Sequence, residues 1–160
     1  MSDKIPFLIV IIAGGCILGF SVYSVYKQKK EYFYELNNFV DNYLQTIMYS
    51  RETLVNIIEK FETSSKLLDK HLNEYIANKT SGLELQLSGG YLKKDELSFV
   101  KSLFNSLGTS DSFTQKSVIG AKREELRKYL ALAEAKFLKN GSSSIKLGFL
   151  GGLLVSVICF

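Results

Sequence analysis

Tryptophan is absent from the chain, and proline, histidine and cysteine together supply only four of its 160 residues. Pro6 is the single proline, so no residue from 7 to 160 breaks a helix in the way that proline does. Long helices are therefore permitted along almost the whole chain. The two cysteines, Cys16 and Cys159, both stand in apolar segments, where thiols pack like aliphatic groups. They predict neither a disulfide framework nor a metal site.

The residue patterns that enzymes of this size use are missing as well. His71 is the single histidine and stands in a polar stretch, so we expect it on a solvated helix face rather than in a catalytic role. Segment 89–94 (GGYLKK) matches neither a nucleoside triphosphate loop nor a dinucleotide fingerprint. Acidic neighbours such as Asp95–Glu96 and Glu124–Glu125 point in different directions on a helix. The sequence predicts no enzyme, no catalytic residue, no metal, no cofactor and no small-molecule substrate.

Both ends of the chain, by contrast, are apolar. Ile5–Tyr26 has twenty-two residues without a charge, and a helix of that length reaches roughly 33 Å, enough to cross a bilayer. Leu147–Phe160 has fourteen uncharged residues, which give only about 21 Å of helix. To cross, this second span therefore needs snorkelling by Lys146, inclusion of Ile145 or local thinning of the bilayer, and a shallow or re-entrant segment is the alternative.

Lysines flank the inner ends of the two apolar segments and predict the orientation. They are Lys27, Lys29, Lys30, Lys136, Lys139 and Lys146. The positive-inside bias places them in the cytoplasm. We expect a transmembrane helix at 5–26, a cytoplasmic helical domain at 27–144 and a transmembrane helix at 145–160, with both termini outside. A cleaved signal peptide, with Gly19 and Ser21 near a processing site, is the competing interpretation of the N-terminus.

The charge of the central segment gives little indication of a nucleic-acid partner. Between Lys27 and Lys146 there are 19 basic and 15 acidic residues, which accounts for the net charge of +4 because Asp3 and Lys4 cancel. This excess is mild and spread along the segment, so we expect no nucleic acid among the partners.

Apolar residues in the middle recur at three- and four-residue intervals, which indicates amphipathic helices. One helix is expected to run from the membrane to about Tyr49. Ser50 is the expected N-cap of a second stripe that runs from Leu54 to Ile76, with Gly82 as its stop. Leu83–Leu87 alternates as a strand does, yet a loop or short helix is favoured because no partner strand follows.

Two further stripes complete the expected fold. The first opens at Asp95 and closes at Gly108, where a left-handed residue would end the helix. The second begins near Asp111 and includes Val118, Ala121 and Leu126. Gly141 and the three serines after it are expected to end that helix and cap the next one. The fold class is therefore all-α, an antiparallel helical bundle flanked by N- and C-terminal transmembrane helices.

Glycines at four-residue spacing lie in both apolar segments. Gly15 and Gly19 form one pair and Gly148 and Gly152 the other, with Ser156 one turn further on. Small residues at this spacing allow helix backbones to approach closely in lipid. These glycines are therefore candidates for packing the spans on each other or on partner proteins.

An LG-x-x-D-x-x-x-Q element, with Gly108, Asp111 and Gln115, stands at a fixed distance from the LGFLGGLL tail that starts at Leu147. In these two elements the C-terminal half of the chain resembles stage III sporulation protein AB of endospore-forming bacteria. The N-terminal half resembles the family less, because Thr46 stands where the family has Glu and Thr53 where it has Pro. By its own residues, the LG-x-x-D-x-x-x-Q element predicts a helix junction that Gly108 closes, Asp111 caps and Gln115 ties back, with partner contact as the alternative.

The resemblance implies a helical domain like that of the F-type platform proteins of type II secretion. It implies a component of the channel complex between mother cell and forespore, seated in the mother-cell membrane that faces the forespore. Its implied partners are the other channel components and the secretion-type ATPase of that complex. A non-enzymatic assembly platform is thus the expected function, and a generic membrane-tethered helical receptor or regulator is the alternative.

Overall fold

The structure is a computed structural model that describes residues 5–49, 52–82, 85–109 and 112–159. Its elements are α1 (Ile5–Tyr49), α2 (Leu54–Lys60), α3 (Lys66–Ser81), α4 (Lys94–Asn105), α5 (Ser112–Lys136), the π-helical turn η2 (Phe137–Gly141) and α6 (Ser142–Cys159). No strand occurs in the described ranges, so the all-α prediction is confirmed. The chain divides into two compact units, residues 1–30 with 132–160 (unit 1) and residues 31–131 (unit 2).

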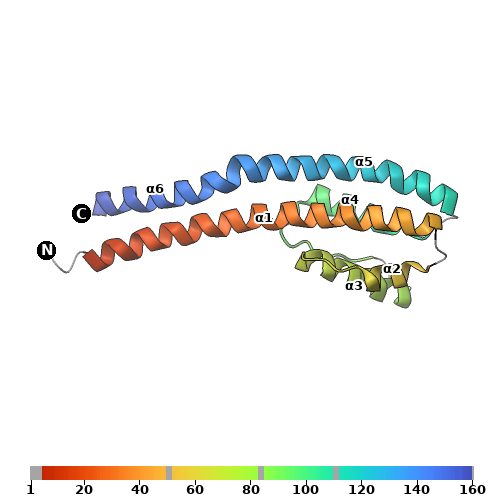
Figure 1. The fold of residues 1–160 in the computed structure, drawn as a ribbon. Coiled ribbons are helices and arrows are strands. Elements are labelled where there is room, and N and C mark those ends of the chain that lie inside the picture. Colours follow the sequence, from red (N-terminus) through yellow and green to blue (C-terminus); the bar gives the residue numbers. More distant parts are fainter. Residues whose placement is uncertain (1–4, 50–51, 83–84, 110–111, 160) are drawn as a thin grey trace. The chain divides into compact units, whose positions relative to one another are not determined.

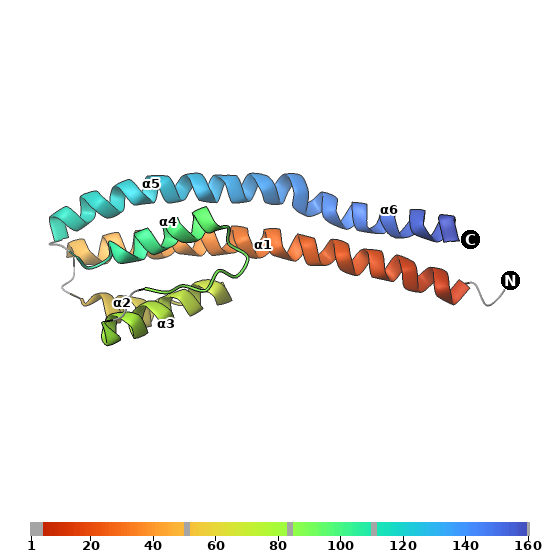
Figure 2. The ribbon, with the colours of Figure 1, turned by 180° about the vertical axis from the view of Figure 1, so that it is seen from behind.

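Helix α1 runs without interruption through 45 residues, as the lack of proline after Pro6 predicts. Its second half forms the centre of unit 2, with α2 and α3 on one side and α5 on the other (Figures 1 and 2). Six of its apolar residues are at most 2% exposed: Tyr32, Phe33, Leu36, Phe39, Val40 and Tyr43. Rings from other elements surround them, and the Phe39 ring lies 5.2 Å from that of Phe61 and 6.4 Å from that of Phe104. Residues on several faces of α1 are thus buried, which explains why aromatic residues crowd this segment.

The stripe from Leu54 to Ile76 forms two helices, so the expectation of one helix capped by Ser50 is wrong. Thr53 is the N-cap of α2 and accepts a hydrogen bond from the Asn56 amide at 3.4 Å. The backbone then leaves the helix at Phe61, and Ser65 caps α3 by accepting from the Leu68 amide at 3.4 Å. The break turns Phe61 onto Phe39. Ser50 itself lies outside the described residues.

Gly82, the expected stop, ends α3 with a φ of 65°. Of the expected loop at Leu83–Leu87, residues 83 and 84 lie outside the described residues, and residues 85–89 are an irregular loop. Helix α4 begins at Lys94, one residue before the expected Asp95, and the Glu96 carboxylate accepts from the Lys93 amide at 2.8 Å. On α5 the buried apolar residues are Ile119, Leu126 and Ala133, whereas the expected Val118 is 39% exposed.

The expected helix end at Gly141 is wrong, because α5, η2 and α6 follow one another without a break. The serines do not cap a new helix. Ser143 and Ser144 instead donate from their hydroxyls to the carbonyls of Lys139 and Asn140, at 3.0 and 2.6 Å. These bonds satisfy carbonyls of the π-helical turn, where the regular backbone pattern is interrupted.

The π-helical turn shifts the buried row of the helix by one residue. Ile119, Leu126 and Ala133 recur every seven residues, and that series would continue at Asn140, Leu147 and Leu154. Leu147 and Leu154 are instead 68% and 64% exposed. The residues in contact with α1 come one position later, at Gly141 and Gly148. A π-helical turn holds one more residue than an α-helical turn, which accounts for the shift.

Two helices are long and apolar enough to cross a membrane, one within Ile9–Tyr49 and one within Phe113–Ile158. Only 6% and 17% of the most apolar part of each helix is buried in the structure. A core helix of a soluble protein would be mostly buried, so these segments expose their apolar side chains to whatever surrounds them.

Candidate functional site

In unit 1, the first half of α1 and α6 lie side by side in opposite directions (Figures 1 and 2). A Cβ atom at Gly15 would stand 2.5 Å from the carbonyl oxygen of Gly148, and one at Gly19 would stand 2.7 Å from that of Ser144. A Cβ at Gly152 would stand 3.1 Å from the Cα of Ile12. The two helices therefore touch backbone to backbone, which a larger residue at these positions would prevent.

All four glycines singled out in the sequence lie in this one contact. Gly148 completes it, because a Cβ there would meet the Gly15 oxygen at 2.5 Å and the Gly19 Cα at 2.9 Å. Gly14 and Gly151 stand next to the contact residues in the sequence, yet a Cβ on either would have no neighbour within 4 Å. The four glycines at four-residue spacing thus face the neighbouring backbone, and Gly14 and Gly151 do not. The structure places them against each other within one chain.

The junction between α4 and α5 is held from two sides. Gly108 has a φ of +69°, the left-handed conformation that favours glycine, and its amide donates to the Tyr43 hydroxyl at 3.3 Å. The Tyr75 hydroxyl donates to the Leu107 carbonyl at 3.1 Å. Gln115 is 2% exposed, and its Nε2 donates to the carbonyl of Ser106, the C-cap of α4. Asp111 lies outside the described residues, so its capping role stays a prediction.

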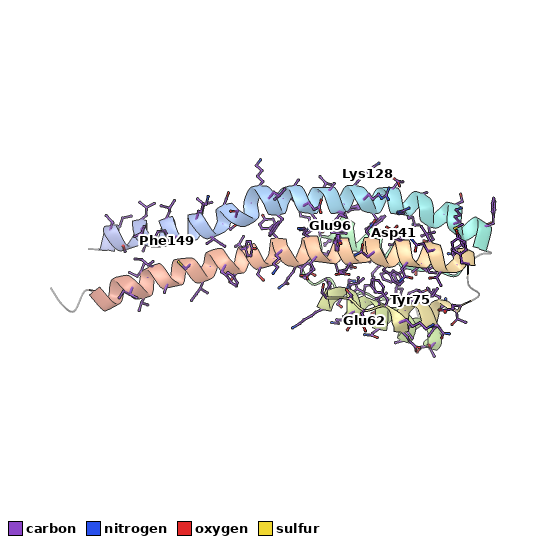
Figure 3. All side chains as sticks on the ribbon, in the orientation of Figure 1. Asp41, Glu62, Tyr75, Glu96, Lys128 and Phe149 are labelled. Atoms are coloured by element: carbon purple, nitrogen blue, oxygen red, sulfur yellow. The ribbon has the colours of Figure 1, made fainter. Side chains whose placement is uncertain are left out.

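An ion pair joins α1 to α5 in unit 2. The Arg123 guanidinium contacts the Asp41 carboxylate, and the Asn37 amide donates to the same carboxylate at 3.2 Å. Figure 3 labels Asp41 on α1. Both charged side chains are about 30% exposed. Such a partly exposed pair contributes little to stability and mainly fixes the pairing of the two helices.

His71 is fully buried, so the expectation of a solvated position is wrong. Its Nε2 lies 2.7 Å from the Ser88 carbonyl and its Nδ1 2.8 Å from the Tyr32 hydroxyl. A carbonyl only accepts, so Nε2 carries the proton and Nδ1 accepts from Tyr32. Ser88 is also bound to Glu74, which accepts from its hydroxyl at 2.9 Å and its amide at 3.1 Å. The network fastens the 85–90 loop to α3 and α1.

Burial lowers the pKa of His71 below its usual value of 6.5, although the Ser88 carbonyl and the Glu74 carboxylate act in the opposite direction. Burial also raises the pKa of Tyr32 well above 10. Both side chains are therefore neutral near pH 7. The signal for burial was present in the sequence, because His71 stands three residues after the buried Leu68 and four residues before the buried Tyr75.

A comparison with protein families identifies the chain. The family model of stage III sporulation protein AB matches residues 4–160, essentially its full length. The chain belongs to this family. None of the curated proteins and none of the solved structures compared with it matches.

Membership in the stage III sporulation protein AB family supports a role in sporulation. The family consists of structural or assembly proteins and is not known for catalysis. Together with the two apolar helices, it indicates membrane association and a membrane complex. Within the described parts of the chain, no group of three or more His, Cys, Asp or Glu residues could hold a metal ion.

Proposed function

We propose that this protein is a non-enzymatic platform of the secretion-like channel between mother cell and forespore. Its two apolar helices span the mother-cell membrane that faces the forespore, with residues 27–144 in the cytoplasm and both termini outside. The central domain contacts the secretion-type ATPase of the complex, and the membrane helices contact other channel components.

One observation carries the proposal. Helix α1 and the continuous series α5, η2 and α6 each pass from an apolar segment into unit 2 without an intervening loop. A tethered receptor needs only a flexible link between its anchor and its domain, whereas a platform has to hold cytoplasmic and membrane partners together. Helical continuity in both connections favours the platform over the receptor or regulator.

The orientation is supported by the lysines at the inner ends of the spans and is tested by cysteine labelling. In a background with Cys16 and Cys159 replaced by alanine, Ser64→Cys and Ser143→Cys should resist an impermeant thiol reagent until the cells are lysed. Ser2→Cys should react in intact vegetative cells made to express the chain, because the N-terminus is placed outside and the membrane of such cells faces the medium. Labelling of Ser64→Cys before lysis would contradict the cytoplasmic domain.

The role as a platform is tested in sporulating cells. A fluorescent fusion should gather at the membrane around the forespore, and the full chain, solubilised in mild detergent, should retain the ATPase. A uniformly distributed fusion that retains no ATPase would support the receptor or regulator instead. A gene for an ATPase and genes for small membrane proteins next to this one are expected only for the platform.

A further inference from the structure

The inner ends of the two apolar helices form a dense basic surface in unit 1. The described residues of unit 1 include one acidic residue, Glu134, and six lysines. The lysines are Lys27, Lys29, Lys30, Lys136, Lys139 and Lys146. Lys27, Lys136 and Lys139 are exposed, and Lys30 is half-buried. We call Lys27, Lys30, Lys136 and Lys139 the basic collar.

Contacts between the helices bring the members of the basic collar to one level. The Lys30 ammonium lies 5.2 Å from the centre of the Phe137 ring, and Asn140 donates to the Tyr26 hydroxyl at 3.5 Å. Residues 26–30 of α1 therefore lie beside residues 137–140 of the other helix. Lys27 and Lys30 stand at the height of Lys136 and Lys139.

An aromatic layer and an apolar surface continue from the basic collar toward the chain ends. The rings of Tyr23 and Phe137 are 5.6 Å apart, and those of Phe20 and Tyr23 are 6.1 Å apart. Beyond them the exposed side chains are apolar, for example Leu18 at 70%, Leu150 at 53% and Leu154 at 64%. The side chains thus change from lysine to tyrosine to aliphatic along the helices. This order matches the parts of a phospholipid from its headgroup to its acyl chains.

We propose that the basic collar is a binding site for anionic phospholipid. The headgroup phosphate is held by the collar ammonium groups, and the acyl chains lie on the apolar surface beyond the aromatic layer. A free phosphate ion would contact the collar ammonium groups alone, whereas a phospholipid contacts both the basic collar and the apolar surface. The inference rests on the part of the proposed function in which both helices span the membrane.

The test uses the full chain purified in a neutral detergent, with bound lipids counted by native mass spectrometry. Phosphatidylglycerol and phosphatidylcholine with identical acyl chains are the probes. The wild-type chain should retain phosphatidylglycerol in preference, and added salt should weaken that preference. Each lysine near a membrane surface contributes about fivefold to anion binding, so changing all four collar lysines to glutamine should lower the preference by about 600-fold.

The control variant changes Lys66, Lys94, Lys116 and Lys128 to glutamine. These four lysines are exposed in unit 2, where Figure 3 labels Lys128 on α5, and the control removes the same total charge. It should retain the preference of the wild-type chain for phosphatidylglycerol. A variant with the four collar lysines changed to arginine should retain it too, because arginine keeps the charge.

Several results would overturn the inference. Equal retention of the two lipids by the wild-type chain would overturn the lipid site, and this result does not depend on whether the glutamine variant folds. An equal loss of preference in the control variant would show that total charge, and not the collar, is responsible. Free glycerol phosphate that displaces phosphatidylglycerol at equal concentration would show a site for a soluble anion.

Alkaline carbonate separates failure of the inference from failure of the proposed function. If carbonate extracts the wild-type chain from membranes, the helices do not span and the proposed function fails in that respect. If the chain resists extraction and the collar variant still prefers phosphatidylglycerol as strongly as the wild-type chain, only the lipid site is wrong.

Discussion

Replacing Gly148 by alanine should loosen the contact between α1 and α6 even though alanine is the better helix former. The added Cβ would stand 2.5 Å from the Gly15 carbonyl oxygen, and ordinary contact begins at 3.4 Å, so the helices must separate by up to about 0.9 Å. If the contact comprises on the order of 40 atom pairs of about 0.1–0.2 kcal/mol, such a gap forfeits roughly 1.5–3 kcal/mol. Higher helix propensity returns up to about 1 kcal/mol, which leaves a net loss of about 0.5–2 kcal/mol.

Gly151→Ala is the matched control. It adds the same methyl group three residues further along α6, at a position where a Cβ has no neighbour within 4 Å. Only the helix propensity changes there, so this variant should be neutral or up to about 1 kcal/mol more stable. The two substitutions should therefore change the stability of the contact between α1 and α6 in opposite directions or, at the least, by clearly different amounts.

The assay follows the separation of the two helices as SDS is added to the full chain in a neutral detergent. A donor and an acceptor dye are attached at Ile9→Cys and Val157→Cys, which are 62% and 74% exposed, with Cys16 and Cys159 replaced by alanine. Energy transfer in Gly148→Ala should be lost at a lower SDS fraction than in the wild-type chain. Coincident transitions for Gly148→Ala and Gly151→Ala would refute the steric reasoning, and the glycines would then only reflect the composition of membrane helices.

Three further predictions concern unit 2. Because the pKa of His71 is lowered in the fold, the unfolded chain binds a proton at a higher pH than the folded chain does, so the free energy of unfolding should fall as the pH drops below about 6.5 and stay level above it. Urea unfolding in detergent at a series of pH values measures this dependence. His71→Gln should flatten that part of the curve. Tyr32→Phe leaves the buried Nδ1 of His71 without its donor and should cost about 1–3 kcal/mol, whereas Tyr34→Phe, at a position 49% exposed, should cost little in the same assay. If Asp111 caps α5, Asp111→Ala should cost about 0.5–2 kcal/mol and Asp111→Asn or Asp111→Ser almost nothing; loss of ATPase binding in Asp111→Asn at unchanged stability would assign the side chain to a partner contact instead.

The features that the sequence predicted well depend on spacing along a single helix. The length of α1 follows from the absence of proline after residue 6, and the all-α fold follows from apolar residues at three- and four-residue intervals. Gly15, Gly19, Gly148 and Gly152 were selected by their spacing, and the structure brings these same four together. Periodicity determines which residues share a face, so it also identifies the face that contacts a neighbour.

The features that the sequence did not predict depend on contacts between elements. Ser50 and Thr53 offer similar capping oxygens three residues apart, and local preference does not distinguish them. His71 has a polar side chain, and its burial becomes possible only because Tyr32 and Ser88, 39 positions before it and 17 after it, satisfy both ring nitrogens. Gly141 looks like a helix stop unless the packing of Phe137 against Tyr23 is known.

The π-helical turn at Phe137–Gly141 decides which face of α6 meets α1. An ordinary α-helix through the same residues would put Leu147 at the angular position of Gly148 and turn the glycines about 100° away from α1. Deleting one of the five residues of the turn should therefore be tolerated, because it restores an ordinary α-helix and leaves Gly148 on the buried row that Ile119, Leu126 and Ala133 begin. One alanine inserted after Lys146 should not be tolerated, because it turns Gly148 and Gly152 about 100° away from α1 while hydropathy, charge and helicity stay almost unchanged.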